Sequence, residues 1–528
     1  MHTDVARMLI TFALHMLTSK RFVSNFGMLA GVSRLALGVT LGLLPSCVLD
    51  DGSMADPNDE ATTAVPNGEE AASMPVCSSG AIRCLAHVKT AGRTENRRIV
   101  SHATTPLAGS FGPPDLQAAY NIDPTKLATS TKPTIAIVDA YGYTNLAADL
   151  AVYRKQYNLP PCPLGTCLKI VNAAGQPTPL PADPPATDDW TIETALDVDM
   201  ASAACPLCNI LVLQAPDPGD GLYTAQNSAA TAGATVISDS WGGPEATPTT
   251  QNPTPQTTQE AYFAHPGIAI FVASGDAGYD DLLGPAAQQG PGYPATSAHV
   301  IAVGATHLVK APGTTRGWAE TAWSTTADPK TGAGGSACSL SIPKPAYQTA
   351  SPCTFKATSD IAAVGDPATG VAVYDTNGTN TGWISVGGTS ASSPFIAGIF
   401  AATGNGSQAS GQFVANNVAK LWDVTSGSNG TCAGKTLLCN AAAGWDGPTG
   451  FGTPNAALFM PAVAGGGGGS GSGSGGGTTT GNGNGTVPGT STGSDGSQDV
   501  TGGCSTGGAG GGGLLLGLAL LGLRRRRR

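Results

Sequence analysis

The stretch WTIETALDVDMASAACPLCNILVLQA, residues 190–215, decides how we interpret the fold of this chain. Residues 190–204 are typical of a helix, and residues 209–215 form a continuous apolar run typical of a buried strand. Similar apolar strands alternate with helical segments along the chain, which is typical of a parallel sheet covered by helices on both faces. We therefore predict an α/β fold with a mostly parallel central sheet.

The same pattern recurs between residues 108 and 462, which we predict to be one domain. Strands are expected at 133–140, 209–215, 234–241, 267–276, 300–306 and 370–376. Helices are expected at 145–157, 190–204, 222–233 and 392–404. In such folds the chemistry collects at the carboxyl ends of the strands, where Asp139 and Asp276 fall.

The composition narrows the class of protein. The chain has 528 residues, of which 41% are hydrophobic and 12% charged, so it can bury a large core. Its formal net charge of −10 argues against nucleic acid as a partner.

Ten of the twelve cysteines form close pairs in the sequence. The pairs are Cys77/Cys84, Cys162/Cys167, Cys205/Cys208, Cys338/Cys353 and Cys432/Cys439. Spacing does not fix the connectivity, but an even set of local pairs is typical of small disulfide loops in an oxidising compartment. The alternative is zinc at Cys205 and Cys208, although no second C-x-x-C motif and no nearby histidine completes a zinc set.

Residues 1–47 are predicted to be a signal region, with Met28 as a candidate for the true start. The sequence LLPSC, at 43–47, also resembles a bacterial lipoprotein box in which Cys47 would be lipidated. Residues 48–107 are expected to be a short, partly disordered propeptide-like segment.

The C-terminal end has two predicted parts. Residues 463–503 are a Gly/Ser/Thr-rich linker with no means of burying a core. Residues 504–528 place Cys504 in a Gly-rich patch, followed by a short apolar span and five arginines. This tail resembles the myxosortase-type sorting tails of bacterial surface proteins, which implies export and anchoring at the cell envelope. A simple tail anchor is the alternative.

Two carboxylates in the opening stretch are candidates for proton transfer. Glu193 and Asp197 are four residues apart and share one face of the predicted helix. Two carboxylates side by side at an apolar boundary raise one pKa, and a carboxylate so tuned can accept and return a proton. The alternative is a solvated acidic face.

The sequence GGTSASSP, at 387–394, indicates a nucleophile. Ser390 follows glycines and opens a predicted helix, whose amino end favours a developing anion. Asp276 follows an apolar strand, where it could cap a helix, bind a metal or, if protonated, donate to an oxyanion. A helix N-cap is the alternative role of Ser390.

Taken together, these motifs resemble those of the sedolisin family of serine-carboxyl peptidases. The resemblance covers nearly all of 111–460 and is carried by ETALD (193–197), SGDAG (274–278), GGTSASSP (387–394) and LWDV…GWDGPTGFGTPN (421–455). It implies a subtilisin-like three-layer fold with a carboxylate in place of the catalytic histidine.

The resemblance also implies a role for each site residue. Ser390 would be the nucleophile, Glu193 its base, Asp197 the residue that orients Glu193 and shares its proton, and Asp276 the oxyanion stabiliser.

A structural calcium site is implied as well. Its ligands would be the carboxylates of Asp423 and Asp446 and the backbone carbonyls of Val424, Ala442 and Gly444, and hard oxygen donors of this kind suit Ca²⁺. An acidic, Gly-rich loop without metal is the alternative.

We therefore expect a secreted, surface-anchored endopeptidase that acts on proteins or peptides at acid pH as a monomer. One alternative is a non-catalytic surface-binding protein on a peptidase fold. A subtilisin with a Ser-His-Asp triad is another, but His265, His299 and His307 do not lie in a fitting turn. So short a propeptide leaves open how latency is kept.

Overall fold

The computed structural model describes residues 72–77, 80–91, 98–99, 103–185, 188–280, 290–324, 332–377, 382–432 and 434–461. The predicted signal region, linker and anchor tail lie outside these residues. Across the part of the chain that is described, no helix is long and apolar enough to cross a membrane.

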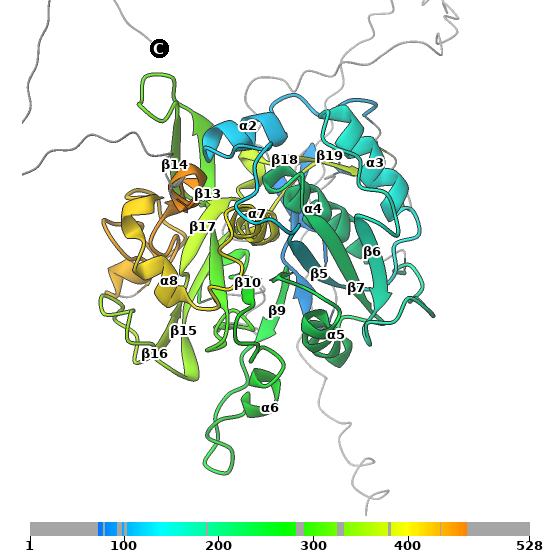
Figure 1. The fold of residues 1–528 in the computed structure, drawn as a ribbon. Coiled ribbons are helices and arrows are strands. Elements are labelled where there is room, and N and C mark those ends of the chain that lie inside the picture. Colours follow the sequence, from blue (N-terminus) through cyan, green and yellow to red (C-terminus); the bar gives the residue numbers. More distant parts are fainter. Residues whose placement is uncertain are drawn as a thin grey trace, which may run out of the picture. The chain divides into compact units, whose positions relative to one another are not determined.

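The central sheet has eight strands in the order β14-β13-β10-β8-β5-β7-β6, with β17 paired to β13 (Figure 1). Its strands are β5 (Thr134–Ala140), β6 (Leu168–Asn172), β7 (Asn209–Ala215), β8 (Val236–Asp239), β10 (Ala269–Ala273), β13 (Ile301–Lys310), β14 (Trp318–Ala322) and β17 (Ile361–Val364). Every neighbouring pair is parallel except β13 with β14. The predicted, mostly parallel sheet is confirmed.

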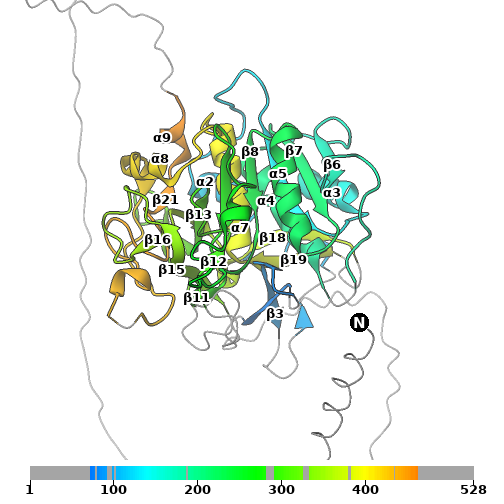
Figure 2. The ribbon, with the colours of Figure 1, turned by 90° about the horizontal axis from the view of Figure 1, so that it is seen from below.

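Helices cover both faces of this sheet (Figures 1 and 2). They are α2 (Pro113–Ala119), α3 (Leu146–Gln156), α4 (Trp190–Ala204), α5 (Asp220–Thr231) and α7 (Thr389–Ala402). Helices α3, α4 and α7 lie on one side, and α5 packs against β5, β7 and β8 on the other. The predicted three-layer arrangement therefore holds.

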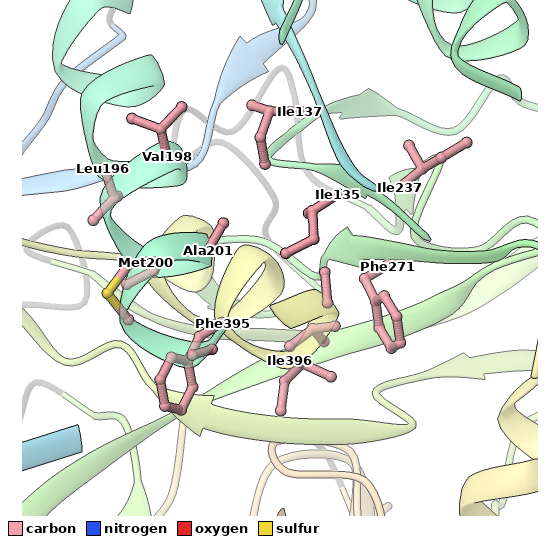
Figure 3. Close-up of a cluster of buried hydrophobic side chains, with 14 of the residues drawn as sticks. Ile135, Ile137, Leu196, Val198, Met200, Ala201, Ile237, Phe271, Phe395 and Ile396 are labelled. Atoms are coloured by element: carbon pink, nitrogen blue, oxygen red, sulfur yellow. The ribbon is translucent and has the colours of Figure 1, made fainter. Parts of the chain in front are cut away.

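Helices α4 and α7 are the centre of the core, and every residue of both is buried. They pack closely because Gly398 faces Ala204, where an added Cβ would lie 2.6 Å from the alanine methyl. Figure 3 shows their side chains against β5, β8 and β10, with Ile135, Ile137, Leu196, Val198, Met200, Ala201, Ile237, Phe271, Phe395 and Ile396 labelled. This burial places polar residues of the two helices in a dry environment.

A second sheet is antiparallel and has the order β1-β3-β19-β18, with β4 paired to β3. Its strands are β1 (Ala72–Pro75), β3 (His87–Ala91), β4 (Arg98–Ile99), β18 (Val371–Asp375) and β19 (Gly382–Gly387). Strand β18 was expected in the parallel sheet, and that expectation is wrong. A parallel crossover needs about a dozen residues, whereas only a short 3₁₀ turn joins β17 to β18.

The propeptide-like segment that we predict at 48–107 is described from Ala72 onward, and its strand β3 pairs with β19 (Figure 2). The described residues belong to one compact unit that ends at Pro461.

The remaining strands form three smaller sheets, in the orders β11-β15-β16, β12-β9-β2 and β20-β21. The strands are β2 (Arg83–Cys84), β9 (Trp241–Pro244), β11 (Ala277–Tyr279), β12 (Gly292–Tyr293), β15 (Ala333–Pro343), β16 (Phe355–Thr358), β20 (Leu421–Trp422) and β21 (Thr453–Pro454). The helical turns are α6 (Thr257–Glu260), η3 (Pro367–Thr369), α8 (Gly411–Ala415), η4 (Val418–Lys420), η5 (Thr436–Leu438) and α9 (Ala456–Phe459).

All five predicted cysteine pairs are disulfides. Cys205 and Cys208 bond to each other at the end of α4, so neither is available to bind zinc. The disulfide framework predicted from the spacing is thereby confirmed.

Candidate active site

The four predicted site residues converge where α4, α7 and the end of β10 meet. Glu193 lies in the first turn of α4 and Asp197 one turn later, and Ser390 lies in the first turn of α7. Asp276 follows β10 and is held by α7 itself, because the Thr389 backbone N–H and hydroxyl donate to its Oδ1 at 2.8 and 2.7 Å.

Helix α7 begins at Thr389, three residues earlier than the 392 that we predicted. Ser390 is therefore the second helical residue, and its backbone N–H has no partner within the helix. This N–H donates to the backbone carbonyl of Leu85 at 3.0 Å. Pro394 consequently lies in the second turn, where its missing N–H leaves the Ser390 carbonyl without the usual helical bond.

Glu193 has no access to solvent, and burial raises the pKa of its carboxyl well above the ordinary value. The nearby Asp139 raises this pKa further, and the Ser390 hydroxyl lowers it. That hydroxyl lies close to Glu193, but its hydrogen bond of standard geometry goes to the Ser240 carbonyl at 3.3 Å. The serine and the predicted base are adjacent without being hydrogen-bonded.

Asp197 is equally inaccessible and accepts a hydrogen bond from the Ser240 hydroxyl at 2.9 Å. Burial raises the pKa of Asp197 well above its ordinary value, and the charges of Asp139 and Glu193 add to this effect. The solvated acidic face that the sequence left open is therefore excluded.

Asp139, at the end of β5, is a member of this cluster that we did not predict as a site residue. Its side chain is fully buried, and burial raises its pKa to about 7. The signal in the sequence was its position at the carboxyl end of a parallel strand.

Asp276 is the fourth buried carboxyl, and burial raises its pKa to about 7 despite the two hydrogen bonds from Thr389. Its second oxygen, Oδ2, accepts no hydrogen bond from the described residues and lies 3.8 Å from the His87 Nε2. In its protonated form Asp276 can donate from this oxygen, as an oxyanion stabiliser must.

His87 is the histidine that sequence reasoning missed. Its Nδ1 lies 3.4 Å from the Ser73 hydroxyl, and its ring packs edge-on against Trp323. The three histidines that the sequence offers for a Ser-His-Asp triad have other partners: His265 contacts the Tyr262 carbonyl, His299 contacts Glu260, and His307 contacts Asp366. None of these contacts reaches Ser390, which agrees with a carboxylate-based site.

The predicted calcium ligands lie together in one loop. Gly444 N–H donates to Asp423 Oδ2, and Ala442 N–H donates to Asp446 Oδ2, each at 2.9 Å. Val424 follows Asp423 and is buried.

Two carboxylates of this loop lie near each other, and no ion pair of the described residues involves either of them. Burial raises the pKa of Asp446 to about 7, and the charge of Asp423 raises it further. Among the described residues no cluster of three or more His, Cys, Asp or Glu side chains could hold a metal ion. Two carboxylates without a cationic side chain are nevertheless hard oxygen donors of the kind that suit Ca²⁺, so the predicted site stays a prediction.

The sequence is similar to a known peptidase family over about half of its length. Residues 195–452 match the model of the subtilase family, peptidase S8. Among curated proteins, kumamolisin from Bacillus sp. (strain MN-32) is 30% identical over 319 residues. That match covers 56% of this chain and 54% of kumamolisin, so the chain spans about half the length of this relative.

Among solved structures, the fold is similar to that of Pseudomonas sedolisin, a serine-carboxyl proteinase complexed with two molecules of pseudo-iodotyrostatin. The TM-score is 0.53 at 23% identity, and the match covers 68% of this chain and 98% of that one. The subtilisin-like fold and the family resemblance predicted from the motifs are confirmed. The roles of the individual residues stay predictions.

Proposed function

Because the chain carries a subtilase-family peptidase domain with sedolisin-type relatives, we propose that it is a serine-carboxyl endopeptidase active at acid pH. The observation that carries this proposal is the position of Ser390 in the first turn of α7, next to the buried Glu193. Asp197 and Asp276 complete the set, and both have a pKa raised by burial.

In this proposal the Ser390 Oγ attacks the carbonyl carbon of the substrate while its proton passes to the Glu193 carboxylate. Asp197 orients Glu193 and shares its proton. The oxyanion accepts from the Ser390 N–H and from protonated Asp276. Glu193 then returns the proton to the leaving amine, and water cleaves the acyl ester by the same steps.

Activity at acid pH is expected because Asp276 must be protonated to donate to the oxyanion. Since burial raises its pKa to about 7, the donor is present below that pH and is lost above it. At the same time Glu193 must be ionised to accept the serine proton. Activity therefore needs a state in which Asp276 is protonated and Glu193 is not, and the protons of these coupled buried carboxyls must be distributed accordingly.

A non-catalytic binding protein is the alternative that the sequence left open. The buried carboxyls speak against it, because desolvating several acids without a compensating cation destabilises a fold that has no use for them.

We also propose that the protein is exported, anchored at the cell envelope through 504–528, and monomeric. Five disulfides support an oxidising compartment. Asp423 and Asp446, with the carbonyls of Val424, Ala442 and Gly444, would hold a calcium ion that stabilises their loop.

Hydrolysis of an unfolded protein by the purified chain, after incubation at acid pH, tests the proposal. Ser390→Ala and Glu193→Gln should each abolish cleavage, whereas the surface variants Ser407→Ala and Asp217→Asn should cleave like the wild type. Activity that survives in either of the first two variants would exclude these residues as nucleophile and base.

A further inference from the structure

The segment between β2 and β3, which contains Leu85, lies across the candidate active site. The Leu85 N–H donates to the Ser240 carbonyl, and the Leu85 carbonyl accepts from the Ser390 N–H, both at 3.0 Å. The Ser390 N–H is the donor that the proposed mechanism assigns to the oxyanion. The Leu85 carbonyl therefore occupies the place of the carbonyl that would be attacked.

The chain on either side of Leu85 is bound as an extended strand. Before it, β2 pairs antiparallel with β9, with Arg83 opposite Gly242. After it, β3 pairs antiparallel with β19, with His87 opposite Gly387. An extended peptide bound by main-chain pairing on both sides of one peptide bond is the binding mode of a substrate strand.

The side chains near this bond are buried as well. Leu85 is 3% exposed and packs against Ala273 at the end of β10. His87 is 5% exposed and contacts Trp323. The fit of backbone and side chains on both sides places the Leu85–Ala86 peptide bond at Ser390.

Main-chain contacts join the two sides of this bond, and a disulfide on its amino side holds the residue before it close to them. The disulfide between Cys77 and Cys84 ties the residue before Leu85 back toward β1. Strand β1 pairs with β3, which follows the bond, over four residue pairs. In addition, the Val76 N–H donates to the Ala86 carbonyl at 2.9 Å.

From this arrangement we infer that the described residues of 72–91 form a built-in inhibitor hairpin, whose reactive bond is Leu85–Ala86 and whose Cys77–Cys84 disulfide prevents its turnover. The inference rests on the proposed peptidase function. It supplies a basis for latency that needs no long folded propeptide.

The chemistry explains why a bound substrate strand inhibits. Ser390 Oγ bonds to the Leu85 carbonyl carbon as its proton passes to Glu193, and the C–N bond to Ala86 breaks as that proton moves to the Ala86 nitrogen. The new amine cannot leave, because β1 and the Val76 bond hold it, while the disulfide keeps Leu85, which carries the ester, close to β1. Its high effective concentration favours attack on the ester, which re-forms the peptide bond and frees Ser390.

The test compares full-length chains that differ in one disulfide. The probe is an internally quenched peptide with the sequence AIRSLAHV, which is segment 81–88 with serine in place of Cys84. The double variant Cys77→Ser/Cys84→Ser should cleave the probe at least about tenfold faster than the oxidised wild type, because its hairpin can leave after cleavage. Mass spectrometry should find a new amino terminus at Ala86 in this variant.

The matched control is Cys162→Ser/Cys167→Ser, which opens a disulfide loop of similar size away from Ser390. It should stay as latent as the wild type and keep the Leu85–Ala86 bond intact. Equal probe cleavage by wild type and the Cys77/Cys84 variant, or a cut at another bond of the hairpin, would overturn the inference.

A second variant, Leu85→Asp, keeps the test decisive if loss of the disulfide disturbs folding. An aspartate against Ala273 should displace the hairpin and raise probe cleavage without a cut at the 85–86 bond. A Leu85→Asp chain as latent as the wild type would show that the hairpin does not inhibit.

The inhibitor hairpin and the peptidase function can be disproved separately. If every chain cleaves the probe at one rate, the peptidase function stands and the inhibitor hairpin is wrong. If no chain cleaves the probe or binds a leucinal peptide aldehyde, Leu85→Asp included, the proposed function itself is wrong.

Discussion

Gly388 is the residue on which the geometry of the site depends most directly. It is the N-cap of α7 and has a φ of 104°, in a region that residues with a Cβ rarely adopt. An added Cβ would lie 2.3 Å from the Leu85 carbonyl oxygen and 2.7 Å from Asp276 Oδ2. The missing side chain lets a peptide carbonyl reach the first turn of α7.

Gly388→Ala should therefore disable the site more than it destabilises the fold. We expect kcat/KM to fall at least about 100-fold, since the oxyanion donors are displaced. The strained backbone should lower the free energy of unfolding by about 1–3 kcal/mol. Gly313→Ala is the control, because its Cβ would meet nothing within 4 Å. A Gly388→Ala enzyme with wild-type kcat/KM would contradict this account.

Asp276 offers a test of the protonated oxyanion donor. Its pKa of about 7 predicts that activity falls as the pH rises through 7, where the donor is lost. Asp276→Asn keeps a donor at every pH, so its pH profile should lack this fall, whereas Asp276→Ala should lower kcat about 100-fold or more. An unchanged alkaline limb in Asp276→Asn would assign that limb to another group.

At the residue scale, motifs predicted four site residues and geometry added three. Asp139 carried a signal in its place at the end of a predicted strand, whereas Ser240 and His87 join the site only through contacts with segments distant in sequence. His87 in particular belongs to a segment whose partner, β19, lies about 300 residues later. No local pattern contains that pairing.

At the scale of the secondary-structure elements, continuous apolar runs predict the positions of the parallel strands well. The start of α7 and the pairing of β18 differ from the prediction, each for a local reason. Strands β5, β7 and β13 begin within one residue of their predicted starts. The start of α7 was placed too late because a proline commonly marks a first helical turn, whereas here the cap is Gly388. Strand β18 has the composition of a buried parallel strand, but its short connection dictates an antiparallel partner.

The loop that contains Asp423 and Asp446 carries the prediction for calcium. If calcium binds, a chelator should lower the melting temperature of the wild type by several degrees, since saturating ligand adds about 3–4 kcal/mol of stability. The double variant Asp423→Asn/Asp446→Asn should already melt lower and should not respond to the chelator. A wild type that is equally stable with and without chelator would argue against the site.

For the whole molecule, the number of buried acids has a consequence for stability. Burial raises the pKa of Asp139, Asp276 and Asp375 to about 7, and the pKa of Glu193 and Asp197 is also raised. The folded state therefore binds more protons than the unfolded state between pH 4 and pH 7. The contribution of these acids to the free energy of unfolding is complete below the pKa that they have in the unfolded chain. It is lost as the pH rises through their higher pKa in the folded state.

We expect the melting temperature to rise as the pH is lowered from 7 to about 4.5, opposite to the usual acid denaturation. Asp375→Asn should make this dependence shallower, because burial outside the active site raises the pKa of Asp375 to about 7. The exposed Asp217→Asn should leave the dependence unchanged. Calorimetry over this range measures both, and a melting temperature that falls on acidification would contradict the prediction.

The pairing of β3 with β19 also bears on which substrates the proposed peptidase could cut. Strand β19 leads directly into α7, the helix that contains Ser390, so removal of the hairpin leaves an open sheet edge beside this serine. A polypeptide must detach its own backbone from other hydrogen bonds before it can pair there. Compact proteins should therefore resist digestion until acid or heat loosens them, and local unfolding of the target rather than its side-chain sequence would set the rate.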